Sequence, residues 1–173
     1  MSSLPGFSAL ALTALASTAL ALAASPASAA GPLDLPAAIE FGASPAALGD
    51  SFDQLCESYQ VRQLDPAELP IAQDSHTQVD CHGFDHAGRG RLAEFVFADD
   101  SLAFIWILTD ASEEGTHLAA LRAQYGTPSH DTPVFVAFAD HNVALRRDVP
   151  EFLYYGEAIA PMYRGWFDQM AAQ

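Results

Sequence analysis

The chain has 173 residues, half of them hydrophobic, and a net charge of −15 from 22 acidic residues against seven arginines and no lysine. This charge argues against nucleic acid and anionic membrane surfaces as partners, and it favours solubility and cationic ligands. Once a leader is removed, the length predicts one domain that is large enough to bury its own core.

The chain begins with a long apolar segment that carries no charged side chain. The first charged residue is Asp34, and the segment before it, FSALALTALASTALALAASPASAAG, ends in small residues. An apolar stretch followed by an Ala-x-Ala-like site is typical of a secretory signal, so we expect residues 1–29 to be a signal peptide with cleavage before Ala30. No Lys or Arg precedes the apolar run, and an uncleaved anchor helix is the alternative.

Residues 30–173 are therefore predicted to form a single exported domain. No second apolar span occurs in them, so no membrane span is expected in the mature chain. The periplasm is the expected compartment, with secretion beyond the cell or anchoring by the uncleaved helix as alternatives.

The first predicted helix begins at Ser44, a good N-cap, with Pro45 at the first helical position. The next segment, VRQLDPAELPIAQDS, contains two prolines and no clean period, so a connection across the surface is expected there. The apolar face of the helix follows helical spacing and comprises Leu48, Phe52, Leu55, Cys56 and Tyr59.

From Thr77 the hydrophobic period changes to two, which predicts a half-buried strand. Cys81 lies on its buried side, and GFDHAGRG, rich in glycine and polar residues, is expected to form a hairpin loop. RLAEFVFADDSLAFIWILTD then predicts two strands joined by a turn at residues 98–101. Residues 102–108 are almost continuously apolar, so we expect the second of these strands to be central or covered on both faces.

Asp110 and Glu113 resemble a capping box at the start of a second helix, which Gly126 and Pro128 end. PVFVAF, VALRR and EFLYYG predict three more strands, and PMYRGWFDQM predicts a closing helix. This order suggests two α-β-β-β units. Hairpin-linked strands favour antiparallel pairing, so we predict an α+β fold in which helices pack on one face of an antiparallel sheet.

Cys56 and Cys81 are the only cysteines of the chain. An even number in an exported protein predicts a disulfide, and two cysteines allow one pairing. There is no Cys-x-x-Cys motif that would lower a thiol pKa, so a redox role is not supported. We therefore predict a structural bridge between the first helix and the first strand.

The stretch HTQVDCHGFDH concentrates three histidines and two aspartates. If His82 and His86 met across the loop beside His76 and Asp80, they would supply nitrogen and oxygen ligands for zinc or copper. However, His-x-x-x-His is a helical spacing, and Gly83 interrupts it. We interpret the stretch as a polar strand face and loop tip and predict no bound metal, with a metal-binding protein as the alternative.

The catalytic motifs with the clearest mechanisms are absent from the sequence: there is no Gly-x-Ser-x-Gly, no His-Glu-x-x-His and no phosphate-binding loop. GRGRLA matches a loose dinucleotide fingerprint, but it opens a predicted strand and not a helix. We therefore expect no cofactor and no enzyme. The alternative is a small hydrolase with a carboxylate pair such as Asp99 and Asp100, although turns commonly use Asp for local hydrogen bonds.

Aromatic residues gather near the C-terminus. We interpret them as a cap on the core; the alternative is an exposed partner patch formed by Tyr163, Trp166 and Phe167. In the closing helix Met162, Trp166 and Met170 share a face by spacing, and such a stripe must be covered by something.

The segments FVFADDSLAFIWILTD and LAALRAQYGTP resemble a pattern in small exported bacterial α/β modules, in which a hairpin strand precedes a helix that ends in YG.P. These modules include outer-membrane-assembly lipoproteins and β-lactamase-inhibitor-protein-like domains. The resemblance implies a non-catalytic binding or assembly module, although the lipidation cysteine of the lipoproteins is missing and no functional residue carries over. We predict a small binding or interaction module whose partner is a protein or a small cationic ligand.

Overall fold

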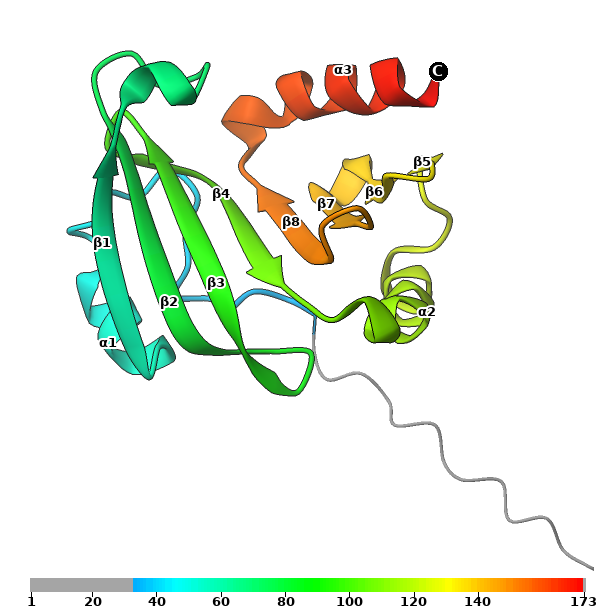
Figure 1. Cartoon of the computed structure of the whole chain (residues 1–173), viewed down its shortest axis with the longest axis horizontal. Coiled ribbons are helices and arrows are strands. Elements are labelled where there is room, and N and C mark those ends of the chain that lie inside the picture. The colour runs from blue at the N-terminus through cyan, green and yellow to red at the C-terminus, as the bar shows by residue number, and fades with distance from the viewer. Residues whose placement is uncertain (1–32, 173) are drawn as a thin grey trace, which may run out of the picture.

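The fold is one antiparallel sheet with helices against it, seen in a computed structural model that describes residues 33–172 (Figure 1). The α+β prediction is therefore confirmed, and the predicted signal peptide and cleavage site lie outside the described residues. The helices of the described chain are α1 (Gly49–Leu55), α2 (Glu114–Tyr125) and α3 (Ala160–Ala171), none of them long and apolar enough to cross a membrane. The strands are β1 (Ser58–Leu64), β2 (His76–His86), β3 (Arg89–Ala98), β4 (Ser101–Leu108), β5 (His130–Asp131), β6 (Phe135–Phe138), β7 (Val143–Arg146) and β8 (Glu151–Tyr155).

The sheet consists of two four-stranded meanders joined by their last strands. Its strand order is β1-β2-β3-β4-β8-β7-β6-β5, and every neighbouring pair is antiparallel. One helix precedes each meander: α1 precedes β1 and α2 precedes β5. The repeated unit is therefore α-β-β-β-β, with one strand more in each half than the sequence predicted.

β1 lies where the sequence predicted the end of a helix and a surface connection. Its burial pattern is almost wholly exposed, so it has no hydrophobic alternation that would reveal a strand. Its order comes instead from pairing with β2 along its whole length, from Ser58 opposite His82 to Leu64 opposite His76. Tyr59 consequently belongs to this strand and not to the apolar face of α1.

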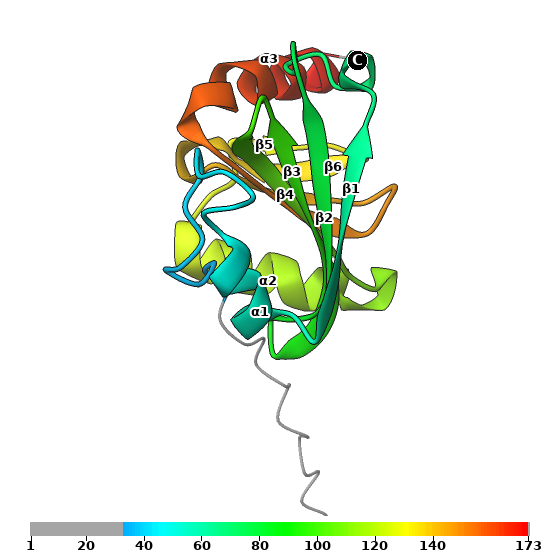
Figure 2. The same cartoon turned by 90° about the vertical axis from the view of Figure 1, so that its left-hand side faces the viewer.

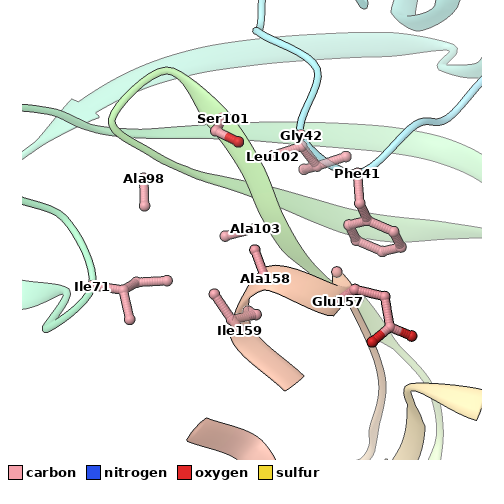
Figure 3. A pocket seen from close by; sticks show the side chains of 11 residues that line it. Phe41, Gly42, Ile71, Ala98, Ser101, Leu102, Ala103, Glu157, Ala158 and Ile159 are labelled. Atoms are coloured by element: carbon pink, nitrogen blue, oxygen red, sulfur yellow. The ribbon is translucent and has the colours of Figure 1, made fainter. Parts of the chain in front are cut away.

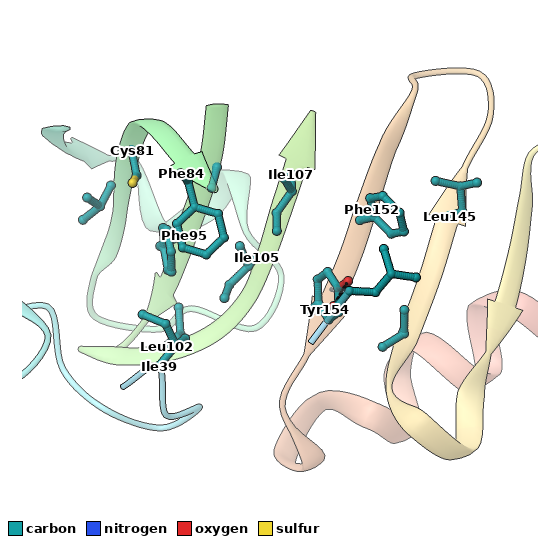
Figure 4. Packing of buried hydrophobic residues seen from close by; sticks show 14 of the residues in the cluster. Ile39, Cys81, Phe84, Phe95, Leu102, Ile105, Ile107, Leu145, Phe152 and Tyr154 are labelled. Carbon is teal, nitrogen blue, oxygen red and sulfur yellow. Dashed lines mark hydrogen bonds between the residues drawn. The ribbon is translucent and has the colours of Figure 1, made fainter. Parts of the chain in front are cut away.

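The sheet divides the core into two layers. α1 and α2 pack on one face through Phe52, Leu118 and Leu121, and this face is called the α1/α2 face below. Figure 4 shows part of this layer, in which Phe84, Phe95 and Ile105 of the first half lie beside Phe152 and Tyr154 of β8.

α3 packs on the opposite face through Ala160, Tyr163 and Phe167, and this face is called the α3 face. Figure 2 shows α2 and α3 on opposite sides of the sheet. The prediction that all helices lie on one face is therefore wrong for α3. The reason is that its inward side chains are continuous with the α3-facing side chains of β6, β7 and β8, among them Phe135, Ala144 and Tyr155.

β2 runs through the segment that was expected to be a hairpin loop. A bulge between Cys81 and Phe84 shifts the register against β3, and Gly83 adopts a φ of 75° there. The extra residue lets both Cys81 and Phe84 face the core. Before the bulge the odd-numbered residues of β2 face the α1/α2 side, and after it the even-numbered residues do, up to His86. The turn itself is only Ala87 and Gly88, both with positive φ, as two-residue hairpins require.

The predicted disulfide is confirmed. Cys56 ends α1, Cys81 is fully buried in β2, and their Cα atoms lie 5.3 Å apart across the bond. The bridge therefore fastens α1 to the α1/α2 face at the point where β2 bulges.

Replacing both Cys56 and Cys81 with alanine is expected to lower the free energy of unfolding by about 2–4 kcal/mol, because the unfolded chain without the disulfide has more conformational entropy. Urea denaturation of the oxidised protein and the double variant measures this. The reduced wild type is the matched control and should lose nearly as much. Equal midpoints for oxidised wild type and double variant would show that the bridge contributes nothing.

Candidate binding face

The structure does not bring together the three histidines and one aspartate of the candidate metal set. His76 is buried with its ring nitrogen 3.3 Å from the Asp65 carbonyl oxygen, whereas His82 is exposed. His86 is 2% exposed and lies on the other face of the sheet, because the bulge at Gly83 exchanges the faces between His82 and His86. No group of three or more His, Cys, Asp or Glu in residues 33–172 is arranged to hold a metal ion.

Asp99 and Asp100 occupy the turn between β3 and β4, both with positive φ. The Asp99 carboxylate accepts the backbone N–H groups of Gln73, Asp74 and Ser75 at 2.9, 2.7 and 3.1 Å. These hydrogen bonds lower the pKa of Asp99. Asp99 therefore holds the β1–β2 connection against the turn, and its acceptor positions are committed to that contact.

Two of the three aromatic residues of the alternative partner patch lie in the core. Tyr163 is 6% exposed and Phe167 is fully buried, and both pack on Tyr155 of β8. Trp166 is half-buried against Phe135, with ring centroids 5.1 Å apart. The predicted Met162–Trp166–Met170 stripe lies to one side of this buried face, and Met162 is 41% exposed.

Part of the α3 face is left uncovered by helices over the first half of the sheet. α3 covers β6, β7 and β8, and the 3-10 helix η1 (Pro66–Glu68) lies over the far end of β1 and β2 (Figures 1 and 2). Between them, side chains of four strands stand in register and reach solvent. We call this set the open face; it comprises Gln60, Arg62, Asp80, Glu94 and Trp106.

Two carboxylates of the open face stand directly opposite one another. Asp80 pairs with Glu94 across β2 and β3, and like charges in such a position destabilise a sheet. Arg62 forms its ion pair with Asp80, through contacts of 2.6 and 3.0 Å, and the Gln78 amide adds a hydrogen bond of 2.7 Å to the same carboxylate. Arg62 acts on Glu94 only at longer range.

The pKa values of the two carboxyl groups move in opposite directions. Burial alone would raise the pKa of Asp80, but hydrogen bonds from Arg62 and Gln78 outweigh it and lower that pKa. Burial and the charge of Asp80 raise the pKa of Glu94, which Arg62 and Gln78 offset only in part. Glu94 forms no ion pair with any residue of the described chain, although its side chain is half-buried.

Trp106 stands opposite Glu94 and forms the aromatic side of the open face. The Arg146 guanidinium lies 5.8 Å from its ring centroid, which is a cation–π distance. Arg146 also binds Glu151 at 3.0 Å, and burial raises the pKa of Glu151 to about 7. The Trp106 ring therefore already makes one cation–π contact, with Arg146 of the same chain.

An apolar pocket of about 310 Å³ lies on the same side of the sheet (Figure 3). Ile71 and Ile159 line it, together with Ala98 of β3 and Ala103 of β4 on the α3 face. Along β3 the α3 face carries Ala98, Val96 and Glu94 in turn, so the pocket and the carboxylate pair are about 13 Å apart at the spacing of a strand. The pocket lining is mostly apolar, whereas the carboxylate pair is negatively charged.

A buried polar cluster on the α1/α2 face was missed by the sequence analysis. Arg91 is 9% exposed and binds both carboxylate oxygens of Glu113, at 2.9 and 3.2 Å. This ion pair joins β3 to the start of α2, and Arg91 lowers the pKa of Glu113 to about 2. The sequence pattern could have indicated this burial, because Arg91 alternates in step with the buried residues Ala93 and Phe95 and so lies on the same face of β3.

Two buried histidines complete this cluster. Both His86 and His117 lie against the Phe152 ring, at 4.7 and 4.9 Å, and each is 2% exposed. The Tyr154 hydroxyl donates to the Leu33 carbonyl at 2.6 Å and lies 2.7 Å from His86 Nε2, so it accepts the Nε2 proton of a neutral imidazole. This cluster ties Leu33 to β8 and β2, and both of its histidines are buried in the core.

Comparisons with family models, with curated proteins and with solved structures find no match to this chain. The resemblance to exported lipoprotein and inhibitor-like modules therefore stays a prediction.

Proposed function

We propose that the protein is an exported, non-catalytic binding module and that its open face holds a cationic side chain of a partner protein. The Cys56–Cys81 disulfide supports export, because such bonds persist in oxidising compartments such as the periplasm. The partner is identified by its chemistry: a Lys or Arg side chain with an apolar group close to it.

The pairing of Asp80 with Glu94 carries this proposal. Two carboxylates in register on paired strands cost stability, and their single cation, Arg62, contacts only Asp80. The carboxylate pair lies beside the aromatic side chain of Trp106. This site is therefore suited to a second cation, which would pair with Glu94 and pack against Trp106. Proteins commonly give up stability in this way at binding sites.

The apolar pocket defines the second part of the partner. An extended segment rises by about 3.3 Å per residue, so a span of about 13 Å corresponds to about four residues. A partner strand with an apolar side chain in the pocket would therefore place a basic side chain about four positions away over Glu94. The net charge of −15 favours the approach of such a basic segment.

Binding is expected to be saturable and to depend on Glu94. The chain has two tryptophans, so Trp166→Phe leaves Trp106 as the only indole reporter on the open face. In this background, at neutral pH and about 0.15 M salt, a tetra-arginine peptide should change the Trp106 fluorescence with a defined dissociation constant. Glu94→Gln should weaken that affinity by at least about tenfold, since it removes the unpaired charge.

Glu40→Gln is the matched control, because Glu40 is exposed elsewhere and the substitution changes the net charge equally. It should leave the affinity nearly unchanged. If both variants weaken binding equally, the peptide senses only the overall charge and the proposal is wrong. A fluorescence signal that never saturates would lead to the same conclusion.

A further inference from the structure

The two edges of the sheet differ in how they are protected from other strands. β5 forms one edge with only two residues, and its side chains are held in place: His130 contacts Asp168 of α3 at 2.9 Å, and Arg122 and Arg147 both bind Asp131. β1 forms the other edge with seven residues and pairs only with β2 within the described chain. A long edge strand exposes a row of backbone N–H and C=O groups that another strand can bind.

β1 also lacks the devices that usually block such pairing. It contains no proline and no lysine, and its one charged side chain, Arg62, is neutralised by Asp80. It contains no carboxylate, although the chain carries 22 acidic residues. A second acidic copy of the protein can therefore approach along β1 without placing carboxylates of the two strands against each other.

Two large apolar side chains of β1 are exposed at the edge of the sheet. Tyr59 is 39% exposed and Val61 is 51% exposed, and they are two of the four large hydrophobic residues that are exposed in the described chain. Both point to the α1/α2 face, opposite the buried residues Cys81 and Val79 of β2. They form an apolar strip that ends at the sheet edge, where a further strand would cover it.

We propose that β1 pairs with β1 of a second copy of this chain, in antiparallel register about Val61, so that two copies share one continuous sheet. In this register Val61 faces its own equivalent, Tyr59 faces Gln63, and Gln60 faces Arg62. None of these pairs places two like charges opposite each other. The strand is therefore complementary to itself, as a two-fold interface requires.

This arrangement has a consequence for the open face. The two-fold axis of an antiparallel strand pair is perpendicular to the sheet, so the α3 faces of both copies lie on the same side. The two open faces then stand next to each other across the shared edge, and a partner with two basic segments engages both. The inference does not depend on the proposed cation site, because Val61 lies on the opposite face of β1.

Sedimentation equilibrium of the purified protein tests the proposal. One strand pair is a small interface, so we expect a monomer–dimer equilibrium that is resolved at total concentrations from about 1 to about 500 µM. Val61→Lys should raise the dimer dissociation constant at least about tenfold, since an edge lysine opposes strand addition. Val149→Lys is the matched control: Val149 is 42% exposed in the β7–β8 turn, gains the same charge, and should leave the equilibrium unchanged.

Hydrogen exchange provides a second readout on the wild type. The β1 amides that point away from β2 should become more protected as the protein concentration rises, and Val61→Lys should abolish that rise. A protein that stays monomeric at every concentration would overturn the proposal. A dimer that Val61→Lys leaves intact would overturn it as well, since its interface would lie elsewhere.

Discussion

Phe167→Ala is expected to lower the free energy of unfolding by about 3–5 kcal/mol, the usual cost of a large-to-small substitution in a packed core. Phe167 is fully buried, and its ring centroid lies 4.7 Å from that of Phe135 and 6.1 Å from that of Tyr163. Removing it opens a cavity in the middle of the layer between α3 and the sheet. Since a domain of this size has only about 5–15 kcal/mol in total, the variant should be close to unfolding.

Urea denaturation at fixed pH measures the change, and the same helix supplies the control. Met162→Ala should cost far less, because Met162 is 41% exposed on α3 and removing it creates no enclosed cavity. Trp166→Ala should fall between the two, as the half-buried position of Trp166 predicts. If Phe167→Ala and Met162→Ala have the same midpoint, α3 does not pack on the sheet in solution, and its aromatic side would again be a candidate partner surface.

Acidification from about pH 7.5 to about pH 4 is expected to remove about 3 kcal/mol of stability through His86, with a further loss from His117. Burial is the main reason that the pKa of His86 falls from 6.5 to about 4; the Leu33 carbonyl opposes this shift, and the charges of Arg91 and His117 add to it. Burial likewise lowers the pKa of His117. As the pH falls, the unfolded chain therefore binds protons at these histidines before the folded protein does. The free energy of unfolding decreases as the pH falls from about 6.5 toward 4.

The geometry explains why His86 resists protonation. Its Nε2 proton is accepted by Tyr154, and its Nδ1 has no hydrogen-bond partner in the structure. A proton on Nδ1 would create a second buried cation beside Arg91, whose guanidinium already uses the Glu113 carboxylate. The His86 contribution is complete above about pH 6.5 and is lost progressively toward pH 4.

A comparison of two variants isolates this contribution. In His86→Gln the side-chain amide can still donate to the Tyr154 hydroxyl but does not titrate, so its stability should fall by about 3 kcal/mol less than wild type over the same pH range. Glu151 acts in the opposite direction. Its pKa in the folded protein is about 7, so the folded protein binds this proton before the unfolded chain does and gains stability as the pH falls below 7. Glu151→Gln removes this gain, so the variant should lose more stability on acidification than wild type. Equal pH dependence in wild type and His86→Gln would show that His86 is protonated without cost in the folded protein.

The parts of the fold that bury a regular apolar pattern were predictable from the sequence. The two hairpin strands before α2, the capping box of Asp110 and Glu113, and the end of the helix at Gly126 all appear where expected. The disulfide followed from cysteine number alone. In each case the local signal and the tertiary packing favour the same structure.

The missed features depend on partners that are remote in the sequence. β1 is exposed on both faces, and only its hydrogen bonds to β2 make it a strand. The bulge at Gly83 reverses the side-chain parity of β2, so His86 enters the core although its spacing from His82 places both on one side of a regular strand. The open face also escaped prediction, because the pairing of Asp80 with Glu94 depends on the strand register, which no local pattern fixes.

The seam between β4 and β8 has a consequence for how the chain folds. All other strand pairs join neighbours in the sequence, so they close short loops at little entropic cost, whereas Ile105 of β4 pairs with Tyr154 of β8 across the whole of α2 and three strands. We therefore expect each meander to assemble first and the seam to close last. Until it closes, both halves expose an almost wholly apolar strand, and this interval is when the folding chain is most prone to aggregate.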